Sequence, residues 1–334
     1  MTYKETYLVQ LWEESMPDIK GSGEIALFRG LSAESCDNFE EVMVEELRRF
    51  NGSNIDELSY SSVRFGLETA LNSLYNRGGT QVFKSRFTEG EKVLPINGLI
   101  WMGQFREMRE RISEKVNQGF NCIKLKIGGI DLSEEIELLR WLRQNFSDRQ
   151  LTLRLDANGS FSRVPYDKAL QSLEHLSKFD IHSIEQPFVP SDIELTRKIC
   201  AEDIIPVALD EQLIGIKSET EKTELLEYLK PQYIILKPSL CGGFTEAKRW
   251  IDIAVNKNIG WWITSALESA IGLNAICQWT AALGVDIPQG LGTGELYTND
   301  FPSPIKRKGE WLSFDSDIRK WELPETIRWI DVQP

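Results

Sequence analysis

The stretch CIKLKIGG at residues 122–129 reads as a short buried β-strand, yet it contains two lysines, Lys124 and Lys126. Side chains two positions apart in a strand share a face, so the lysines point one way while Ile123, Leu125 and Ile127 point the other. Isolated ammonium groups are costly to bury. The apolar face suits packing against helices, and we therefore expect the lysines to face the interior of a barrel.

Short apolar runs alternate with longer amphipathic stretches from about residue 94 onward. The runs begin at residues 94, 122, 151, 181, 205, 233, 260 and 289. Helical stretches between them open with capping-box patterns at Asp131, Ser191 and Ser218. Alternating β and α elements imply a parallel sheet, and seven or eight units in about 200 residues favour a closed (β/α) barrel. A doubly wound open sheet is the alternative, but no glycine-rich phosphate loop follows the first strand.

Charged residues end five consecutive predicted strands, at intervals of 30, 29, 25 and 27 residues. These residues are Lys126, Asp156, Glu185, Asp210 and Lys237. The carboxyl ends of barrel strands meet at one mouth, so we expect the five charges to converge there. Two structural alternatives are a salt-bridge network inside the barrel and, for a single strand, rim lysines that reach into water.

Three carboxylates that lie close together repel one another unless a cation binds among them. Oxygen-only ligands favour a hard ion, first Mg²⁺ and then Mn²⁺ or Ca²⁺. A lysine must lose its proton to act as a base, and both the charge of Lys124 and a nearby ion favour this loss at Lys126. Lys237 on the opposite wall would stabilise negative charge on a carboxylate substrate.

The two ends of the chain have a different pattern from the barrel. We predict that residues 1–93, with helices near 32–50 and 60–76, form the first part of an α+β capping domain. Residues 94–295 are the predicted barrel, and 296–334 are expected to return to the cap.

Composition narrows the classes of partner. The 334 residues are 41% hydrophobic and carry a net charge of −13, which disfavours nucleic acid and anionic membrane surfaces. The sequence lacks an apolar run of about 18 residues and a secretory signal pattern. Five scattered cysteines without a CxxC pair fit a reducing cytoplasm. We expect a small-molecule carboxylate as the substrate. A homo-oligomer is a further possibility for the assembly of the chain.

These motifs resemble the enolase superfamily, in its muconate-lactonizing-enzyme-like branch, and most closely the o-succinylbenzoate synthase family. The similar segments are KLK, LRLDANGSF, SIEQP, ALDEQL, ILKPSLCGG and SALESAIGL. The resemblance implies a modified (β/α)₇β barrel with an α+β capping domain. The segment TYKETYLVQLWE resembles the second strand of such a cap, so a cap without its first strand and lid loop is expected.

The resemblance also implies roles for individual residues. Asp156, Glu185 and Asp210 would bind Mg²⁺, and Lys126 and Lys237 would be catalytic. Lys124, Asn158 and Ser265 would contact substrate. The implied activity is that of a hydro-lyase, the syn dehydration of 2-succinyl-6-hydroxy-2,4-cyclohexadiene-1-carboxylate to 2-succinylbenzoate, a menaquinone precursor.

Two other functions stay open. An N-succinylamino acid racemase or related epimerase would use the same two lysines as bases on opposite faces of its substrate. A non-catalytic binding protein or an inactive truncated relative is the alternative from another class. Two further expectations concern residues within the barrel strands. Arg154 shares the inward face of Asp156 and should form a salt bridge beneath the site, with substrate contact as the alternative, and His182 should point outward with a structural role.

Overall fold

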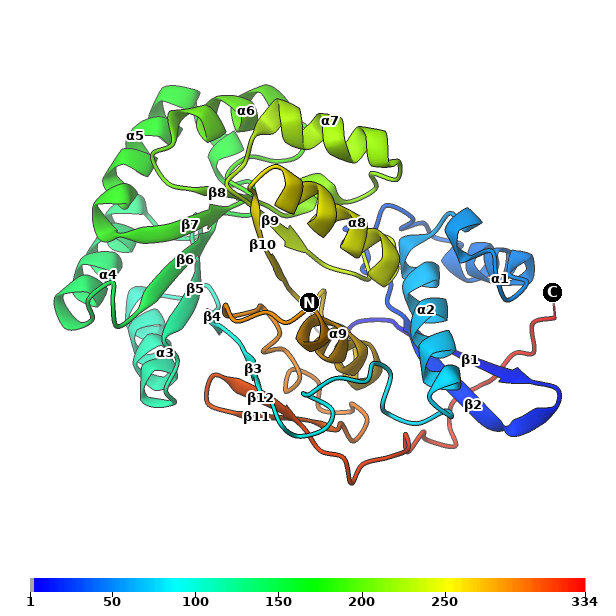
Figure 1. The fold of residues 1–334 in the computed structure, drawn as a ribbon. Coiled ribbons are helices and arrows are strands. Elements are labelled where there is room, and N and C mark those ends of the chain that lie inside the picture. The colour runs from blue at the N-terminus through cyan, green and yellow to red at the C-terminus, as the bar shows by residue number, and fades with distance from the viewer. Residues whose placement is uncertain (1–2, 334) are drawn as a thin grey trace.

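The computed structural model describes residues 3–333 and contains a barrel with a smaller α+β unit beside it (Figure 1). Seven parallel strands form one sheet in the order β10-β9-β8-β7-β6-β5-β4, so each strand pairs with the next along the chain. Their bounds are β4 (Gly98–Ile100), β5 (Cys122–Lys126), β6 (Thr152–Asp156), β7 (Ile181–Glu185), β8 (Val207–Leu209), β9 (Tyr233–Leu236) and β10 (Gly260–Ile263). Successive βα units of one hand produce this order.

Helices cover the outer face of this sheet (Figure 1). They are α3 (Phe105–Asn117), α4 (Leu132–Asn145), α5 (Tyr166–Leu176), α6 (Ile193–Glu202), α7 (Glu219–Leu229), α8 (Gly243–Asn256) and α9 (Ala270–Ala282). Short 3-10 turns are η1 (Ile55–Glu57), η2 (Phe161–Arg163), η3 (Ser177–Phe179) and η4 (Glu211–Leu213). The predicted capping box of α7 is confirmed, since Ser218 and Glu221 each accept the other's backbone N–H. The α6 helix has Asp192 at its N-cap instead of Ser191.

The eighth apolar run closes the barrel through isolated bridges instead of a regular strand. Gln289 pairs with Ile96 beside β4, and Gly290 pairs with Thr264 beyond β10, both in parallel. The side-chain oxygen of Gln289 also accepts the N–H of Ile263 at 2.8 Å. The barrel is therefore confirmed, but its eighth strand is reduced to two pairing residues.

The smaller unit has a two-stranded antiparallel sheet packed on helices. Its elements are β1 (Tyr7–Glu13), β2 (Met16–Ile25), α1 (Phe39–Arg49) and α2 (Ser61–Tyr75). The second predicted helix, at 60–76, matches α2, whereas the first begins at residue 39 instead of 32. The chain turns before α1, where the N–H of Ser32 donates to the carbonyl of Phe28 at 2.8 Å and the hydroxyl of Ser32 accepts the N–H of Phe28 at 2.9 Å, and the residues between this turn and α1 form no regular helix.

The C-terminal segment forms a hairpin and then runs toward the smaller unit. Strands β11 (Ile305–Lys308) and β12 (Trp311–Phe314) pair antiparallel, and β12 pairs with β3 (Leu94–Pro95) just before the first barrel strand. Beyond the hairpin, the carbonyl of Arg319 accepts the N–H of Thr80 at 3.0 Å. The boundaries proposed between the units stay predictions.

Buried carboxylates of the cap fasten it to the barrel. Glu24 of β2 accepts the N–H groups of Ser269 at 3.0 Å and Gly272 at 2.9 Å, at the start of α9. Glu68 of α2 accepts the N–H of Thr245 at 3.3 Å, at the start of α8. A carboxylate is favourable at a helix N-terminus because it meets unpaired N–H groups and the positive end of the dipole. Both helices begin at the carboxyl ends of barrel strands, so these bonds hold the cap beside the barrel mouth.

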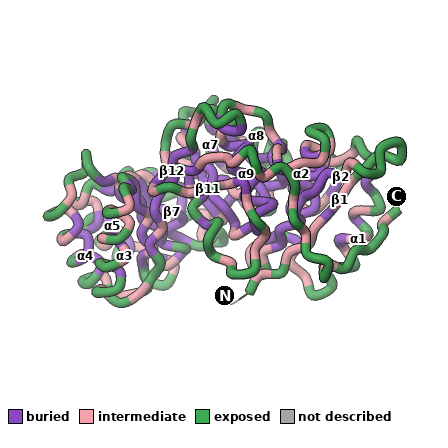
Figure 2. The backbone as a smooth tube through the Cα atoms, turned by 90° about the horizontal axis from the view of Figure 1, so that it is seen from below, coloured by how far each residue is buried: buried purple, intermediate pink, exposed green. Residues whose placement is uncertain are grey.

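Buried residues follow the barrel strands and the contact between β2 and α2, while the outer helices expose one side to solvent (Figure 2). Each unit has its own apolar cluster, the larger around the barrel sheet and the smaller around Val63 and Leu67 of α2. Within residues 3–333, every helix falls short of the length and apolar character needed to cross a membrane.

Two glycines allow β2 to lie directly against α2. A Cβ on Gly21 would lie 2.0 Å from the carbonyl oxygen of Ala70, and one on Gly23 would lie 2.0 Å from that of Gly66. Backbone atoms of a packed helix cannot yield as a flexible side chain does, so the contact leaves no space for a side chain on β2 at these positions.

We expect Gly23→Ala to lower the free energy of unfolding by about 3 kcal/mol, because the added methyl group forces β2 away from α2. Urea unfolding followed by circular dichroism measures the change. Gly294→Ala is the control, since a Cβ there approaches only the end of the Leu273 side chain, at 3.1 Å. Equal unfolding free energies for Gly23→Ala and the wild type would contradict the close contact.

Candidate active site

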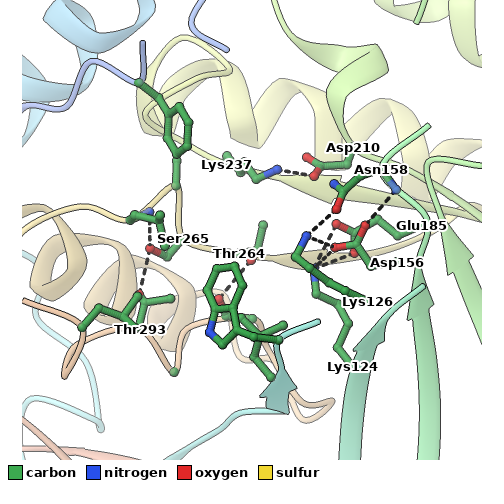
Figure 3. Close-up of a pocket in the computed structure, with 18 of the residues that line it drawn as sticks. Lys124, Lys126, Asp156, Asn158, Glu185, Asp210, Lys237, Thr264, Ser265 and Thr293 are labelled. Carbon is green, nitrogen blue, oxygen red and sulfur yellow. Dashed lines mark hydrogen bonds and ion pairs between the residues drawn. The ribbon is translucent and has the colours of Figure 1, made fainter. Parts of the chain in front are cut away.

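The five charged residues at the strand ends lie together at one end of the barrel (Figure 3). Strand pairing sets the Cα atom of Lys126 opposite Asp156, and that of Asp156 opposite Glu185. Asp210 follows β8 directly, and Lys237 follows β9 directly. All five line one cavity of about 580 Å³, so the structure brings together the set that the spacing identified.

Two ammonium groups on β5 neutralise the carboxylates of β6 and β7. Lys124 Nζ lies 3.0 Å from Asp156 Oδ2 and 2.9 Å from Glu185 Oε2. Lys126 Nζ also lies 3.0 Å from Asp156 Oδ2. Both carboxylates are almost fully buried, whereas the two lysine side chains keep 12% and 19% of their surface exposed to the cavity. The lysines thus reach solvent while the acids do not.

A third pair occupies another part of the wall, where Lys237 forms an ion pair with the buried carboxylate of Asp210. The sheet order places three strands between β9, which ends at Lys237, and β5, which ends at Lys126. In a closed barrel, strands separated in this way lie on opposite walls. The cavity therefore has an ammonium group on each side.

Burial and neighbouring charges act against each other in this cluster. Burial opposes ionisation of Asp156, but Lys124 and Lys126 outweigh it and hold the pKa of that carboxyl well below its usual range. Burial and the neighbouring charge of Asp156 together raise the pKa of Glu185 to about 8. Burial also opposes the charge on Lys124, yet Asp156 and Glu185 raise its pKa above the usual value. The Lys124 ammonium is therefore a permanent positive charge in this arrangement.

The donor set fits a hard divalent cation. Asp156, Glu185 and Asp210 come from three neighbouring strand ends, offer only carboxylate oxygens and are each at most 2% exposed. Across residues 3–333, no group of three metal-ligating side chains is gathered into a formed cluster. The reason is visible in the ion pairs, since each carboxylate faces an ammonium group. An ion that binds among them must compete with those lysines.

Asn158 and Ser265 both line the cavity, but their surroundings differ. Asn158 is exposed, accepts a hydrogen bond from Lys126 and donates one to Glu211 at 3.2 Å. Ser265 is buried, and its hydroxyl donates to Glu268 at 2.7 Å. Glu268 is a positioning residue that our reading of the sequence missed, because an acid just before a helix resembles an ordinary cap.

The cap completes the cavity with apolar side chains. Tyr3, Phe28 and Leu31 of the cap line it together with Leu99 and Trp101 of the barrel. A mostly apolar cavity with charged groups gathered at one end suits an organic molecule that carries a carboxylate.

Arg154 lies beneath the charged layer, and the salt bridge predicted for it is wrong. Among the described residues, no carboxylate lies within ion-pair distance of its guanidinium. The guanidinium instead lies 4.1 Å from the centroid of the Trp262 ring, and its Nη1 donates to the carbonyl of Pro288 at 2.8 Å. The acids of this barrel lie one layer higher, at the strand ends, which leaves Arg154 an aromatic partner.

The outward direction predicted for His182 is also wrong, because β7 contains a bulge. Leu153 pairs with Ile181, but the next residue, Arg154, pairs with Ser183, so His182 is an extra residue in its strand. An extra residue shifts the alternation of side chains between the two faces. The expectation that side chains alternate strictly between the two faces therefore fails at His182, although it holds at Glu185 at the end of the same strand.

The ring of His182 lies among aromatic side chains of the barrel interior. It stacks on Tyr233 with the ring centroids 4.9 Å apart, and the Trp262 ring lies 6.1 Å away. Burial, and to a smaller extent the positive charge of Arg154, lower the pKa of His182 to about 4. A neutral histidine thus belongs to the layer beneath the charged residues.

Comparisons with known proteins agree on fold and family. Residues 107–308 match the family model described as "Enolase C-terminal domain-like". The o-succinylbenzoate synthase of Desulfotalea psychrophila is 49% identical over 253 residues, which cover 76% of this chain and 68% of that relative. The crystal structure of MenC from Desulfotalea psychrophila LSv54 has a TM-score of 0.79 and 40% identity, and the match covers 92% of this chain and 94% of that one. The muconate lactonizing enzyme of Pseudomonas putida shares the fold, with a TM-score of 0.76, 18% identity and coverage of 95% and 90%.

We expect acid to destabilise the fold through His182. Its pKa in the folded chain lies below the unfolded value of 6.5, so the unfolded chain binds the proton more readily as the pH falls from 6.5 to about 4. This loss should be on the order of 1–2 kcal/mol for a partly buried group and should be absent in His182→Phe, which keeps an aromatic ring.

Urea unfolding at several pH values measures this effect. The exposed His175 of α5 is the only other histidine, and His175→Phe should keep the pH dependence of the wild type. If His182→Phe lost as much stability in acid as the wild type, the neutral buried histidine would be refuted.

Proposed function

The chain belongs to the enolase superfamily and, within it, to the o-succinylbenzoate synthase family, and on that premise we propose that it is a metal-dependent o-succinylbenzoate synthase. Such an enzyme removes water from 2-succinyl-6-hydroxy-2,4-cyclohexadiene-1-carboxylate and releases 2-succinylbenzoate, a menaquinone precursor. The observation that carries the proposal is the pair of ammonium groups, Lys126 and Lys237, on opposite walls of a cavity that also holds three buried carboxylates.

We assign proton transfer to Lys126. As a free amine it would take the α-proton of the substrate carboxylate, and the resulting ammonium would return this proton to the departing hydroxyl. A C–H and a C–O bond break, a C=C bond forms, and water leaves from the face on which the proton was taken. The contacts of Lys126 with Asp156 and Asn158 hold its Nζ atom at the cavity surface, where one group serves both steps.

We assign charge stabilisation to Lys237 and Lys124. Burial opposes the charge of Lys237, but the carboxylates of Asp210, Glu211 and Glu185 together outweigh it and raise the lysine pKa above its usual value, so this side chain stays protonated. A fixed cation on the far wall favours the enediolate that forms when the α-proton leaves. Lys124, which bridges Asp156 and Glu185, is placed to meet the substrate carboxylate.

We propose Mg²⁺ as the metal, with Mn²⁺ as the alternative, held by Asp156, Glu185 and Asp210. When bound, such an ion polarises a carboxylate and favours negative charge upon it. The protein supplies three oxygens from rigid strand ends, which leaves further positions for the substrate. Support comes from the chemistry of the donor set and from its burial.

A homo-oligomer and a cytoplasmic location stay predictions. The cytoplasmic location has support only from the five cysteines, which are all free thiols and four of which are buried.

We expect Lys126→Ala and Lys237→Ala each to lower turnover by at least about 10³-fold, because proton transfer and charge stabilisation are lost separately. The conversion of the cyclohexadiene carboxylate to 2-succinylbenzoate is followed by ultraviolet absorbance, with racemisation of N-succinylamino acids assayed in parallel. Lys248→Ala is the control, because Lys248 pairs with Asp252 on the outer surface of α8. Near wild-type turnover in Lys126→Ala would refute the mechanism.

Metal binding is expected to stabilise the fold as well as to support turnover. Mg²⁺ at about 100 times its Kd should raise the free energy of unfolding by about 2.7 kcal/mol, and Glu185→Gln should lose most of this gain. Thermal unfolding with and without EDTA measures it, and Glu194→Gln on the exposed face of α6 should respond as the wild type does. EDTA should abolish turnover and Mg²⁺ restore it, whereas a non-catalytic binding protein would show no turnover in either state.

A further inference from the structure

Trp101 is a large aromatic side chain at the cavity that the mechanism above does not use. It follows β4 directly, lines the cavity and keeps 43% of its surface exposed. The Nζ atom of Lys126 lies 5.9 Å from the centroid of its ring. An indole left accessible beside a reactive group is a candidate for contact with a ligand, because aromatic side chains bury a large area in specific geometries.

The backbone that carries Trp101 is anchored to α3. Arg111 donates from one nitrogen to the carbonyl of Trp101 at 2.9 Å and to that of Met102 at 3.0 Å. Glu107 accepts the N–H of Gln104 at 3.1 Å, which fixes the other end of the segment. The indole is therefore presented from a tied backbone and not from a loose loop.

The segment is also packed against the loop that follows Lys126. A Cβ on Gly129 would lie 2.4 Å from the sulfur of Met102, so the two loops touch at that point. The second loop is fixed in turn, because Gly128 donates its N–H to Glu135 at 2.6 Å. These contacts join the loop that carries Trp101 to the loop that follows Lys126.

The side of the cavity around Trp101 is apolar. Leu99 precedes it on β4, and Leu296 lies on the same cavity with 44% of its surface exposed. The charged groups are gathered instead at the ends of β5 to β9. A substrate whose carboxylate lies among those charges therefore has its apolar part directed toward this wall.

We propose that Trp101 is a specificity-determining residue whose indole face packs on the six-membered ring of the substrate and so favours unsaturated cyclic carboxylates over flexible acyclic ones. This inference rests on the proposed function. The carbon that loses its proton must approach Lys126 to about 3–3.5 Å. When that carbon belongs to a ring, the ring lies alongside the indole. An acyclic N-acylamino acid presents no ring at the same place.

The test compares two ligands in the Mg²⁺-loaded protein by isothermal titration calorimetry. We expect Trp101→Ala to raise the Kd of 2-succinylbenzoate about tenfold and that of acyclic N-succinylalanine at most about twofold. Trp101→Phe retains an aromatic face and should stay within about threefold of the wild type for both ligands. Trp311→Ala is the matched control, since Trp311 is also 43% exposed but lies on β12 outside the cavity.

The outcomes distinguish the role of Trp101 from the proposed function. An unchanged Kd for 2-succinylbenzoate in Trp101→Ala, or an equal change for both ligands, would overturn the role of Trp101. Wild-type protein that binds 2-succinylbenzoate but does not dehydrate the cyclohexadiene carboxylate would overturn the proposed function, while the Kd ratio still decides the role of Trp101. Wild-type protein that does not bind 2-succinylbenzoate would overturn both.

Discussion

Charge neutrality in a buried space is the constraint on which the rest of the structure depends. Asp156, Glu185 and Asp210 are each at most 2% exposed, and three carboxylates cannot be ionised there without cations close by. Lysines on β5 and β9 supply these cations from side chains that are long enough to reach the carboxylates and still touch the cavity. The carboxyl ends of the strands offer both burial for the carboxylates and access to the cavity for the lysines. The charges therefore recur at one height in the barrel.

The layer beneath these charges separates them from the rest of the barrel interior. Arg154 lies against Trp262, and the neutral ring of His182 stacks on Tyr233. This layer pairs with none of the acids above it, yet it puts one positive guanidinium below them. The acids are thus flanked by cations on two sides, and the aromatic rings fill the space beneath.

The sequence allowed the barrel and the strand-end residues to be predicted because two independent signals coincide there. The interval of one βα unit repeats, and each residue at that interval is charged, in agreement with the family resemblance that the comparisons confirm. Features set by irregular backbone could not be predicted. The bulge at His182 shifts the alternation of side chains between the two faces of β7, which a reading of the sequence takes to be regular. The eighth strand is reduced to bridges at Gln289 and Gly290. Trp101 resembles a core residue until its neighbours are known.

The attachment of the cap to the barrel links substrate recognition to catalysis. Glu68 holds the start of α8, which follows the loop of Lys237, and Glu24 holds the start of α9, which follows the loop of Ser265. The cap that contributes Phe28 to the cavity therefore also fixes the loops that carry site residues. A shift of the cap would alter the shape of the cavity and the position of these loops together, so substitutions far from the strand ends can change turnover without touching a charged group.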